Sequence, residues 1–414
     1  MKKLSIRIAL LTAICWGVWC PLYSENSLPF TNGFLDLSDF HYRSKGSIEL
    51  NGIWEFHWNE LIDPNEIVSA THSPEYVSLP GVWNGVKTGE ITLTGQGFAT
   101  YRLKVRGSFK GEHLAIEMPA VYNAYKLWVN QVEVAKNGSP SSSFETSTPQ
   151  WLPLTEDFYS TSDTLDIVIH VSNFRHEKGG ISEPIVLGTL EALSQRRAAR
   201  LSANILEIIG LTVISIAFLI FYFASKRDIS LMLFSGLCLD WALRASCTDL
   251  YLLVCYFPNF NWSVAMKLEY MTLYIAVILG TMFIAKTYPN ESNKIFRNLV
   301  AVVSGVFILV TLLVNTVMVS YLLTPFLIFA ALIMLYVLNI VLTAAINNRA
   351  GAVYSSLGAV FLILVWFYDL LAYHSFFEIN HILLSFGYLL TFSTNAMALI
   401  YKKKKTQATA KNYS

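Results

Sequence analysis

Charged residues are scarce in this sequence. Asp, Glu, Lys and Arg make up 14% of its 414 residues, hydrophobic residues make up 54%, and the net charge is +1. Because soluble proteins carry nearer a quarter charged residues, the deficit indicates a membrane protein. The balanced charge also leaves no basic excess for a nucleic-acid backbone, so we expect no nucleic-acid partner.

Cysteine is absent from the stretch 30–192. Of the five cysteines, two lie near the N-terminus and three lie in or beside a later apolar segment, at positions 15, 20, 238, 247 and 255. A domain of about 160 residues is large enough to bury its own core without disulfides. We therefore expect residues 30–192 to fold without cross-links.

Catalytic and metal-binding motifs are missing as well. The sequence contains no nucleophile elbow, no phosphate-binding glycine loop and no His-Glu-x-x-His motif. His374 and His381 are seven residues apart across the start of an apolar segment, a spacing that matches no metal site. We expect neither an enzyme nor a cofactor or metal site.

What the sequence does have is a series of long apolar segments between residues 201 and 401. Each has about the 17–25 residues that a helix needs to cross a bilayer. Short polar joints separate the segments and leave no room for soluble domains, so we predict one all-α bundle of transmembrane helices. The seven predicted spans are 204–224, 230–247, 265–285, 298–317, 320–343, 352–373 and 381–401.

The distribution of basic residues predicts the orientation of the bundle. Alternate joints hold Lys or Arg at 226–227, 286–297 and 349 and at Lys402–Lys405, whereas the joints between them hold none. The positive-inside rule then puts everything before Leu201 outside and the tail, 402–414, in the cytoplasm. We interpret Lys402–Lys405 as a stop-transfer anchor, with binding to anionic lipid as the alternative.

Ahead of the bundle the sequence predicts a signal peptide and a β domain. Residues 1–24 carry basic residues and then an apolar stretch shorter than a span, typical of a cleaved secretion signal. Residues 30–192 contain short alternating stretches such as Tyr101–Arg106, and Leu165–Val171 is apolar on nearly both faces, as a central strand would be. We predict an all-β sandwich or jelly roll outside the membrane, joined to the bundle by the short segment Ser194–Arg200.

Several motifs occur in an order that resembles a known family. The motifs are GIWEF at 52–56, LPGVW at 79–83, GQGFATYR at 95–102, AYKLWVN at 124–130, VSNF at 171–174, LR at 243–244 and KLEY at 267–270. This order resembles bacterial seven-transmembrane receptors with diverse intracellular signalling modules, whose outer domain is a galactose-binding-like jelly roll. The outer domain is also similar to the sugar-binding domain of some β-glycosidases. The resemblance covers about residues 34–401.

The resemblance implies a receptor in the cytoplasmic membrane of a bacterium. Its outer domain would bind a small molecule such as a carbohydrate, and its bundle would pass the signal inward. Family members usually continue after the seventh span into an output module, whereas this sequence stops at Ser414, so we expect output through a separate cytoplasmic protein. A transporter or channel and a membrane-anchored binding protein without signalling are the alternatives.

Candidate ligand-binding residues in the outer domain are aromatic or polar side chains. Carbohydrate sites combine aromatic faces with a few placed charged or amide groups. Most tryptophans of a sandwich fill the core instead, which is what we expect for Trp54 and Trp128. The candidates are Trp83, Arg102, Trp151, Arg175 and His176.

Charged side chains inside the predicted spans are the second set of candidates. Charges at that depth are costly and normally face the bundle interior, where they find partners. Asp240 and Arg244 are four residues apart and share a helix face, which predicts an intrahelical ion pair. Glu269 and Asp369 complete the set.

Overall fold

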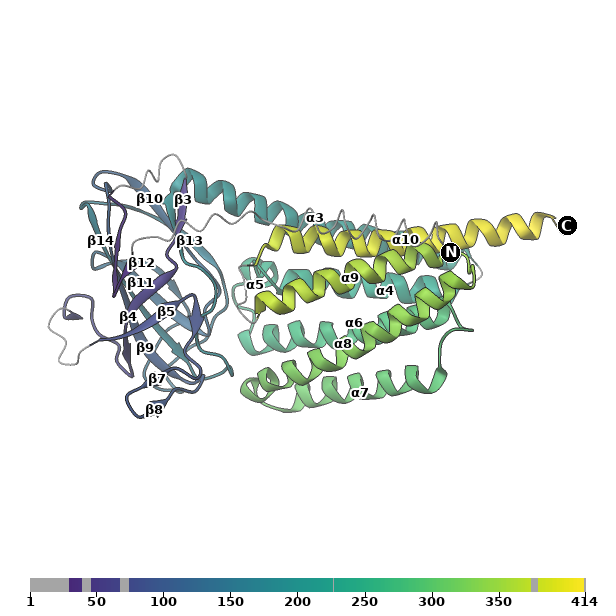
Figure 1. Cartoon of the computed structure of the whole chain (residues 1–414), viewed down its shortest axis with the longest axis horizontal. Coiled ribbons are helices and arrows are strands. Elements are labelled where there is room, and N and C mark those ends of the chain that lie inside the picture. The colour runs from purple at the N-terminus through teal and green to yellow at the C-terminus, as the bar shows by residue number, and fades with distance from the viewer. Residues whose placement is uncertain (1–29, 39–45, 68–73, 226, 374–378, 413–414) are drawn as a thin grey trace.

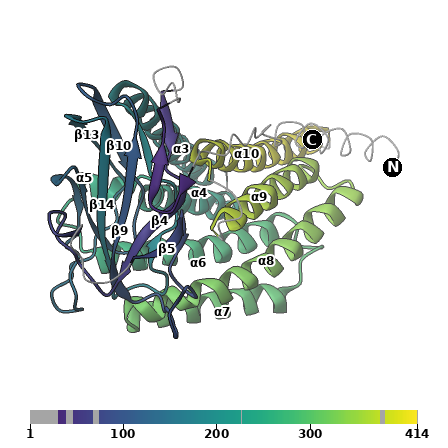
Figure 2. The same cartoon turned by 60° about the vertical axis from the view of Figure 1, so that its left-hand side comes forward.

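A β-sandwich packs against one end of a bundle of long helices in this computed structural model, which describes residues 30–38, 46–67, 74–225, 227–373 and 379–412 (Figure 1). The expected signal peptide, the basic residue at 226 and His374 lie outside these ranges. Figure 2, turned by 60°, shows the two parts from a second side. The predicted order, an all-β domain followed by an all-α membrane domain, is confirmed.

The β domain consists of two facing sheets. The larger, eight-stranded sheet contains β1 (Phe30–Thr31), β2 (Phe34–Asp36), β4 (Gly52–Trp58), β5 (Glu75–Leu79), β9 (Gly97–Arg106), β11 (Ala124–Val129), β12 (Val132–Asn137) and β14 (Thr164–Asn173). The smaller, four-stranded sheet contains β13 (Leu154–Tyr159), β10 (His113–Met118), β16 (Val186–Thr189) and β3 (Ser47–Glu49), in that order. Two short two-stranded pairs are β6 (Gly81–Val82) with β15 (Gly180–Ile181) and β7 (Lys87–Thr88) with β8 (Ile91–Thr92). The sandwich is thus sheet-rich as predicted, while a jelly-roll connection of its strands stays a prediction.

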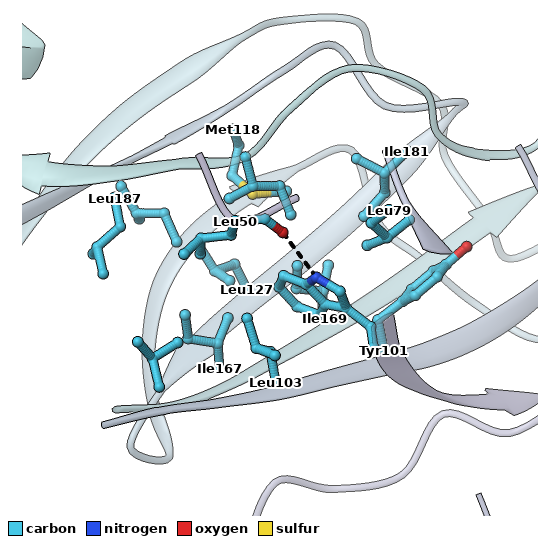
Figure 3. Packing of buried hydrophobic residues seen from close by; sticks show 14 of the residues in the cluster. Leu50, Leu79, Tyr101, Leu103, Met118, Leu127, Ile167, Ile169, Ile181 and Leu187 are labelled. Atoms are coloured by element: carbon cyan, nitrogen blue, oxygen red, sulfur yellow. Dashed lines mark hydrogen bonds between the residues drawn. The ribbon is translucent and has the colours of Figure 1, made fainter. Parts of the chain in front are cut away.

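The core of the sandwich follows the alternation of side chains along each strand. In β9, Tyr101 and Leu103 point inward and are buried, and Met118 of the smaller sheet packs opposite them (Figure 3). β14 is central, between β9 and β11, as its apolar pattern predicts. Trp54 is fully buried as expected, and its indole N–H donates to the Leu50 carbonyl at 3.1 Å.

Trp128 does not lie in the core, contrary to the prediction. It follows the inward-facing Leu127 in β11, so the two-residue period of a strand turns it to the outer face of the larger sheet. There its ring packs edge-on against His170, with centroids 4.5 Å apart, and the Lys126 ammonium lies 4.9 Å from its centroid. An apolar-looking strand pattern identifies two faces without saying which one is buried.

Seven helices of the described residues are long and apolar enough to cross a membrane, which confirms the predicted count. They are α3 (Leu190–Ala224), α4 (Ile229–Cys247), α6 (Trp262–Thr287), α7 (Lys294–Leu313), α8 (Thr316–Ile346), α9 (Ala352–Tyr373) and α10 (His381–Asn412). A short helix, α5 (Leu252–Tyr256), lies in the connection between α4 and α6, at the end of the bundle that faces the sandwich (Figure 1).

The first membrane helix begins much earlier than the predicted span. α3 starts at Leu190, directly after the last strand, and the side chain of its N-cap residue Thr189 accepts a hydrogen bond from the Ala192 amide at 3.2 Å. The predicted joint 194–200 is therefore helical. With 35 residues at about 1.5 Å each, α3 is about 52 Å long, and its first turns stand beside the sandwich.

The basic joints gather at the end of the bundle opposite the sandwich. α10 extends past the other helices there (Figure 1). Lys402 donates to the Thr287 carbonyl at 2.6 Å, and Lys403 lies 3.7 Å from Asp228, so the start of the tail is tied to two neighbouring joints. Which end of the bundle faces the cytoplasm stays a prediction from the positive-inside rule.

Candidate functional site

Aromatic side chains from both domains meet where the sandwich contacts the bundle. Trp151, in the connection before β13, lies 5.6 Å from the ring of Tyr251 and 5.6 Å from that of Trp262. On the sandwich side it packs edge-on against Tyr122 and His176 at 5.7 Å each. The two domains therefore share one apolar seam, of which Trp151 is the centre.

His176 links the loop after β14 to α6. Its ring stacks on Tyr122 with centroids 4.3 Å apart, and its Nε2 lies 3.4 Å from the Tyr270 hydroxyl. The Lys178 amide donates to its Nδ1 at 3.0 Å. Burial lowers the pKa of His176 to about 3, so the imidazole is neutral at physiological pH.

An ionic group joins α3 to the sandwich and to the connection after α4. The Arg200 guanidinium donates to Glu117 of β10 at 2.8 Å and to Asp249 at 2.5 Å. His381, the first residue of α10, lies 3.1 Å from the same Asp249. Arg196, one turn before Arg200, contacts Glu117 at 3.4 Å. Four segments are thus held by buried or half-buried charges.

A cavity of about 230 Å³ lies beneath this seam, inside the end of the bundle that faces the sandwich. Tyr122 and Trp151 of the sandwich close it on one side, and helices α3, α4, α6, α8, α9 and α10 and the connections after α4 and before α10 contribute the rest of its lining. Because both domains contribute lining residues, an occupant of the cavity would contact both at once.

The lining of the cavity is unusually rich in charged groups for the interior of a bundle. Four carboxylates line it, Glu207, Asp249, Glu269 and Asp369, together with Arg244 and His381. Arg244 donates to the Glu269 carbonyl at 2.8 Å, and its guanidinium lies 5.7 Å from the ring of Trp241. The Tyr388 hydroxyl donates to Asp369 at 3.4 Å.

Four buried polar atoms of the lining residues have no hydrogen-bond partner among the described residues. They are Oδ1 of Asn204, Oε2 of Glu269, Nε1 of Trp151 and Nε2 of His381. Asn204 uses its amide nitrogen to donate to the Ala245 carbonyl at 3.1 Å, so its oxygen is held in place but unpaired. Buried polar atoms without partners are rare in native proteins, and next to a cavity they indicate groups that meet a ligand.

Trp83 and Arg102, two of the predicted ligand-binding residues, do not line this cavity. Trp83 is 2% exposed, in the core, and its indole N–H donates to the Gly95 carbonyl at 2.9 Å. Arg102 lies on the outer face of the larger sheet, where it binds Asp166 through two hydrogen bonds of 2.8 and 2.6 Å and approaches Glu55 at 3.6 Å. The hydrogen bonds to Asp166 raise the pKa of Arg102 above its ordinary value.

The other three outer-domain candidates lie at or near the seam. Trp151 lines the cavity, and His176 stands behind Tyr122. Arg175 lies on the same loop but turns away, with its guanidinium 4.0 Å from the ring of Phe144. Its backbone amide donates to the Asn123 side chain at 3.2 Å.

Of the four candidates in the spans, Arg244, Glu269 and Asp369 come together at the cavity and Asp240 does not. The expected ion pair between Asp240 and Arg244 is wrong. Arg244 reaches across to α6 instead, and Oδ2 of Asp240 is buried without a hydrogen-bond partner in the described ranges. The longer arginine side chain can follow the polar cavity toward the end of the bundle, whereas the shorter aspartate one turn below cannot.

Sequence reasoning missed Asn204, Glu207 and Asp249, which also line the cavity. A signal for the first two was present, because Asn204 and Glu207 are three residues apart within an otherwise apolar span and so share one helix face. Asp249 stands in a joint and carried no such signal.

A comparison with protein-family models gives a match in the membrane half. Residues 205–402 match the model of a family described as 7TM diverse intracellular signalling. A search of curated proteins gave no match.

Some solved structures of glycoside hydrolases resemble part of the chain. A β-glucuronidase from Ruminococcus gnavus in complex with D-glucuronic acid is 12% identical, with a TM-score of 0.28 over 34% of this chain and 29% of that one. A GH2 β-galacturonidase from Eisenbergiella tayi bound to glycerol is 16% identical, with a TM-score of 0.26 over 35% of this chain and 24% of that one. The chain spans less than a third of the length of either structure, and likeness at this level carries no argument about function.

Proposed function

Residues 205–402 match the model of a family described as 7TM diverse intracellular signalling, and we propose from this match that the protein is a sensor for a small extracytoplasmic molecule. The protein is a multi-pass membrane protein of receptor type. In the proposal, the ligand binds in the cavity between sandwich and bundle. The observation that carries the proposal is that both domains line this one cavity.

A ligand can change the state of the bundle only if it favours one of two arrangements. The cavity supports such a bias, since Tyr122 and Trp151 of the sandwich line it together with six helices. α3 is continuous from the last strand of the sandwich to the far end of the bundle, so a small tilt of the sandwich would move its far end. Arg200 ties the same helix to Glu117 and Asp249 beside the cavity.

A carbohydrate is one ligand class that the lining supports. Sugar sites pair aromatic faces with carboxylate and amide groups, and the cavity offers Tyr122 and Trp151 with Glu207, Glu269 and Asn204. Its volume of about 230 Å³ is below the roughly 300 Å³ at which drug-sized pockets begin, so the ligand is small.

We place the output at the opposite end of the bundle, in the cytoplasm of a bacterium. The proposed surface consists of the joints at 286–297 and 344–351 and of Lys402–Lys405. It is supported by the contacts that tie Lys402 to Thr287 and Arg349 to Glu291 at 2.7 Å, because these contacts link three joints into one surface. A separate cytoplasmic signalling protein would bind there.

Thermal melting of the full chain in lipid nanodiscs tests the cavity as the ligand site. A panel of monosaccharides should contain at least one that raises the melting temperature of the native protein and not that of Trp151→Ala. Trp128→Ala is the matched control, because Trp128 is another tryptophan of the sandwich, half-buried on the outer face of the larger sheet and away from the cavity. A ligand that stabilises Trp151→Ala as well as the native protein would place the site elsewhere.

Proximity labelling from the C-terminus, with and without such a ligand, tests the output. We expect the set of labelled cytoplasmic proteins to change when ligand is present. An identical set in both states would leave a membrane-anchored binding protein without signalling.

Transport is a second candidate function, because a second cavity continues from the first. It has a volume of about 140 Å³, is mostly apolar, and shares Trp241, Leu273 and Trp366 with the charged cavity. Two cavities in series would suit a path through the bundle. Uptake of the stabilising ligand into sealed liposomes would favour this function, and binding without uptake would favour the sensor.

A further inference from the structure

We propose that the cavity between sandwich and bundle binds a small organic cation, a molecule with at least one ammonium group. This inference rests on the proposed function and names the ligand class of its site. The inference rests on three features of the cavity. Its lining has more carboxylates than basic groups, it has unpaired hydrogen-bond acceptors, and it includes aromatic side chains.

The charges of the lining residues do not balance. Asp249 is matched by Arg200 at 2.5 Å and by His381 at 3.1 Å. Three carboxylates remain, Glu207, Glu269 and Asp369, and Arg244 is the one guanidinium among the lining residues. Carboxylates inside a bundle are costly unless they are paired. A cationic occupant would supply the missing positive charge, whereas an anion would add to the imbalance.

Unpaired atoms give independent support, because two of the four are oxygens that accept hydrogen bonds. Oδ1 of Asn204, a residue only 2% exposed, and Oε2 of Glu269 have no hydrogen-bond partner among the described residues. An ammonium group has three donors and no acceptor, so it suits such a pair of oxygens. The unpaired Nε1 of Trp151 is a donor and would meet a hydroxyl or another acceptor on the same ligand.

Aromatic rings complete the environment of a cation. Trp241, Trp366 and Tyr388 line the cavity from the bundle, and Tyr122 and Trp151 line it from the sandwich. Aromatic rings attract a cation to their faces electrostatically, and the attraction is stronger where the cation is desolvated. In the described part of the chain no three His, Cys, Asp or Glu side chains are arranged to hold a metal ion, which favours an organic cation over a metal.

Two pairs of compounds test the proposal, each differing only by an ammonium group in place of a hydroxyl. They are ethanolamine against ethylene glycol, and glucosamine against glucose. Binding to the full-length protein in nanodiscs is measured by calorimetry and by thermal shift at fixed ionic strength. We expect each amine to bind at least tenfold more tightly than its alcohol partner.

Variants locate the binding in this cavity. Glu269→Gln should weaken amine binding at least tenfold, and Glu207→Gln is the second variant should the first fail to fold. Asp240→Asn is the matched control, since Asp240 is a half-buried carboxylate of the same bundle that does not line the cavity, and this variant should bind the amines as the native protein does.

Two results would overturn the proposal. If glucose binds as tightly as glucosamine, the site takes a neutral carbohydrate, and the proposed sensor function stands without the cation. If neither amine binds, or if Glu269→Gln and Glu207→Gln both bind them like the native protein, the cavity is not a cation site. The sensor function is tested separately, by ligand-dependent proximity labelling, and does not depend on either of these results.

Discussion

Arg200 is the single side chain that holds α3, the sandwich and the connection after α4 together. Its side chain is only 12% exposed, and it satisfies Glu117 and Asp249 at once. Removing one partner of a buried ion pair leaves the others charged and unpaired, which costs more than the pair contributes.

We therefore expect Arg200→Ala to lower the free energy of unfolding by about 3 kcal/mol. Arg196→Ala is the control, because Arg196 contacts the same Glu117 but is 41% exposed, and exposed pairs contribute about 0–1 kcal/mol. Thermal melting of both variants in nanodiscs is the measurement. Equal losses for the two variants would show that Arg200 has no special role.

His176 makes the contact between the domains sensitive to acid. Its pKa is about 3 in the folded protein because burial disfavours the charged imidazole, against about 6.5 in an unfolded chain. A lowered histidine pKa stabilises the fold above pH 6.5, and the contribution is lost as the pH falls from there toward 3.

Native protein should therefore lose about 2 kcal/mol more stability than His176→Phe between pH 7 and pH 5. Phenylalanine keeps a ring to stack on Tyr122 and cannot take up a proton. Chemical unfolding at several pH values gives the difference between the two proteins, in which the other titrating groups cancel. If the free energy of unfolding depended on pH in the same way in both proteins, His176 would already be accessible to protons in the folded state.

The residues of the cavity show how far sequence reasoning reaches at this scale. Glu269 and Asp369 were identifiable because a carboxylate inside an apolar span is conspicuous. That they meet Asp249 and Tyr122 depends on how α6 and α9 pack against each other and against a separate domain, which no local pattern encodes. The ion pair expected for Asp240 failed for the same reason, since Arg244 had a better partner on another helix.

α3 is the element that connects the two halves of the molecule. The apolar spans were predictable because crossing a bilayer sets both their length and their composition. The first turns of α3 were not, because they carry Arg196, Arg197 and Arg200, and a hydropathy pattern ends where such residues begin. Their helical state depends on the cap at Thr189 and on contacts with the sandwich.

A break in this helix should separate ligand binding from output. Ala199 is exposed and lies in the interior of α3, so Ala199→Pro removes a backbone hydrogen bond and kinks the helix at a cost of about 3 kcal/mol. We expect ligand to stabilise this variant still, while ligand-dependent proximity labelling is lost. Ala199→Ser at the same site should retain both. Retention of labelling in the proline variant would exclude α3 as the route.

At the scale of the whole molecule, one natural cysteine can report the orientation. Cys255 follows α4 in the connection beside the sandwich and is exposed, whereas Cys238 and Cys247 are buried. If the sandwich lies outside, a membrane-impermeant maleimide should label Cys255 in spheroplasts, and Cys255→Ser should remove the signal.

A cysteine at the other end of the bundle provides the opposite control. Asn347 is exposed just after α8, so Asn347→Cys in a Cys255→Ser background should react only after the membrane is permeabilised. Labelling of Asn347→Cys in intact spheroplasts would reverse the proposed topology.

The absence of a linker between strand β16 and helix α3 limits how this architecture can exchange parts. A helix turns by about 100° and rises about 1.5 Å per residue, so deleting one residue after Thr189 would swing a grafted sandwich a quarter turn or more around the bundle. Arg196 and Arg200 would then face away from β10. Inserting seven residues restores the angle to within about 20°. Chimaeric receptors built on this bundle should therefore work only when the junction preserves the helical phase. Domains joined through flexible linkers are not subject to this constraint.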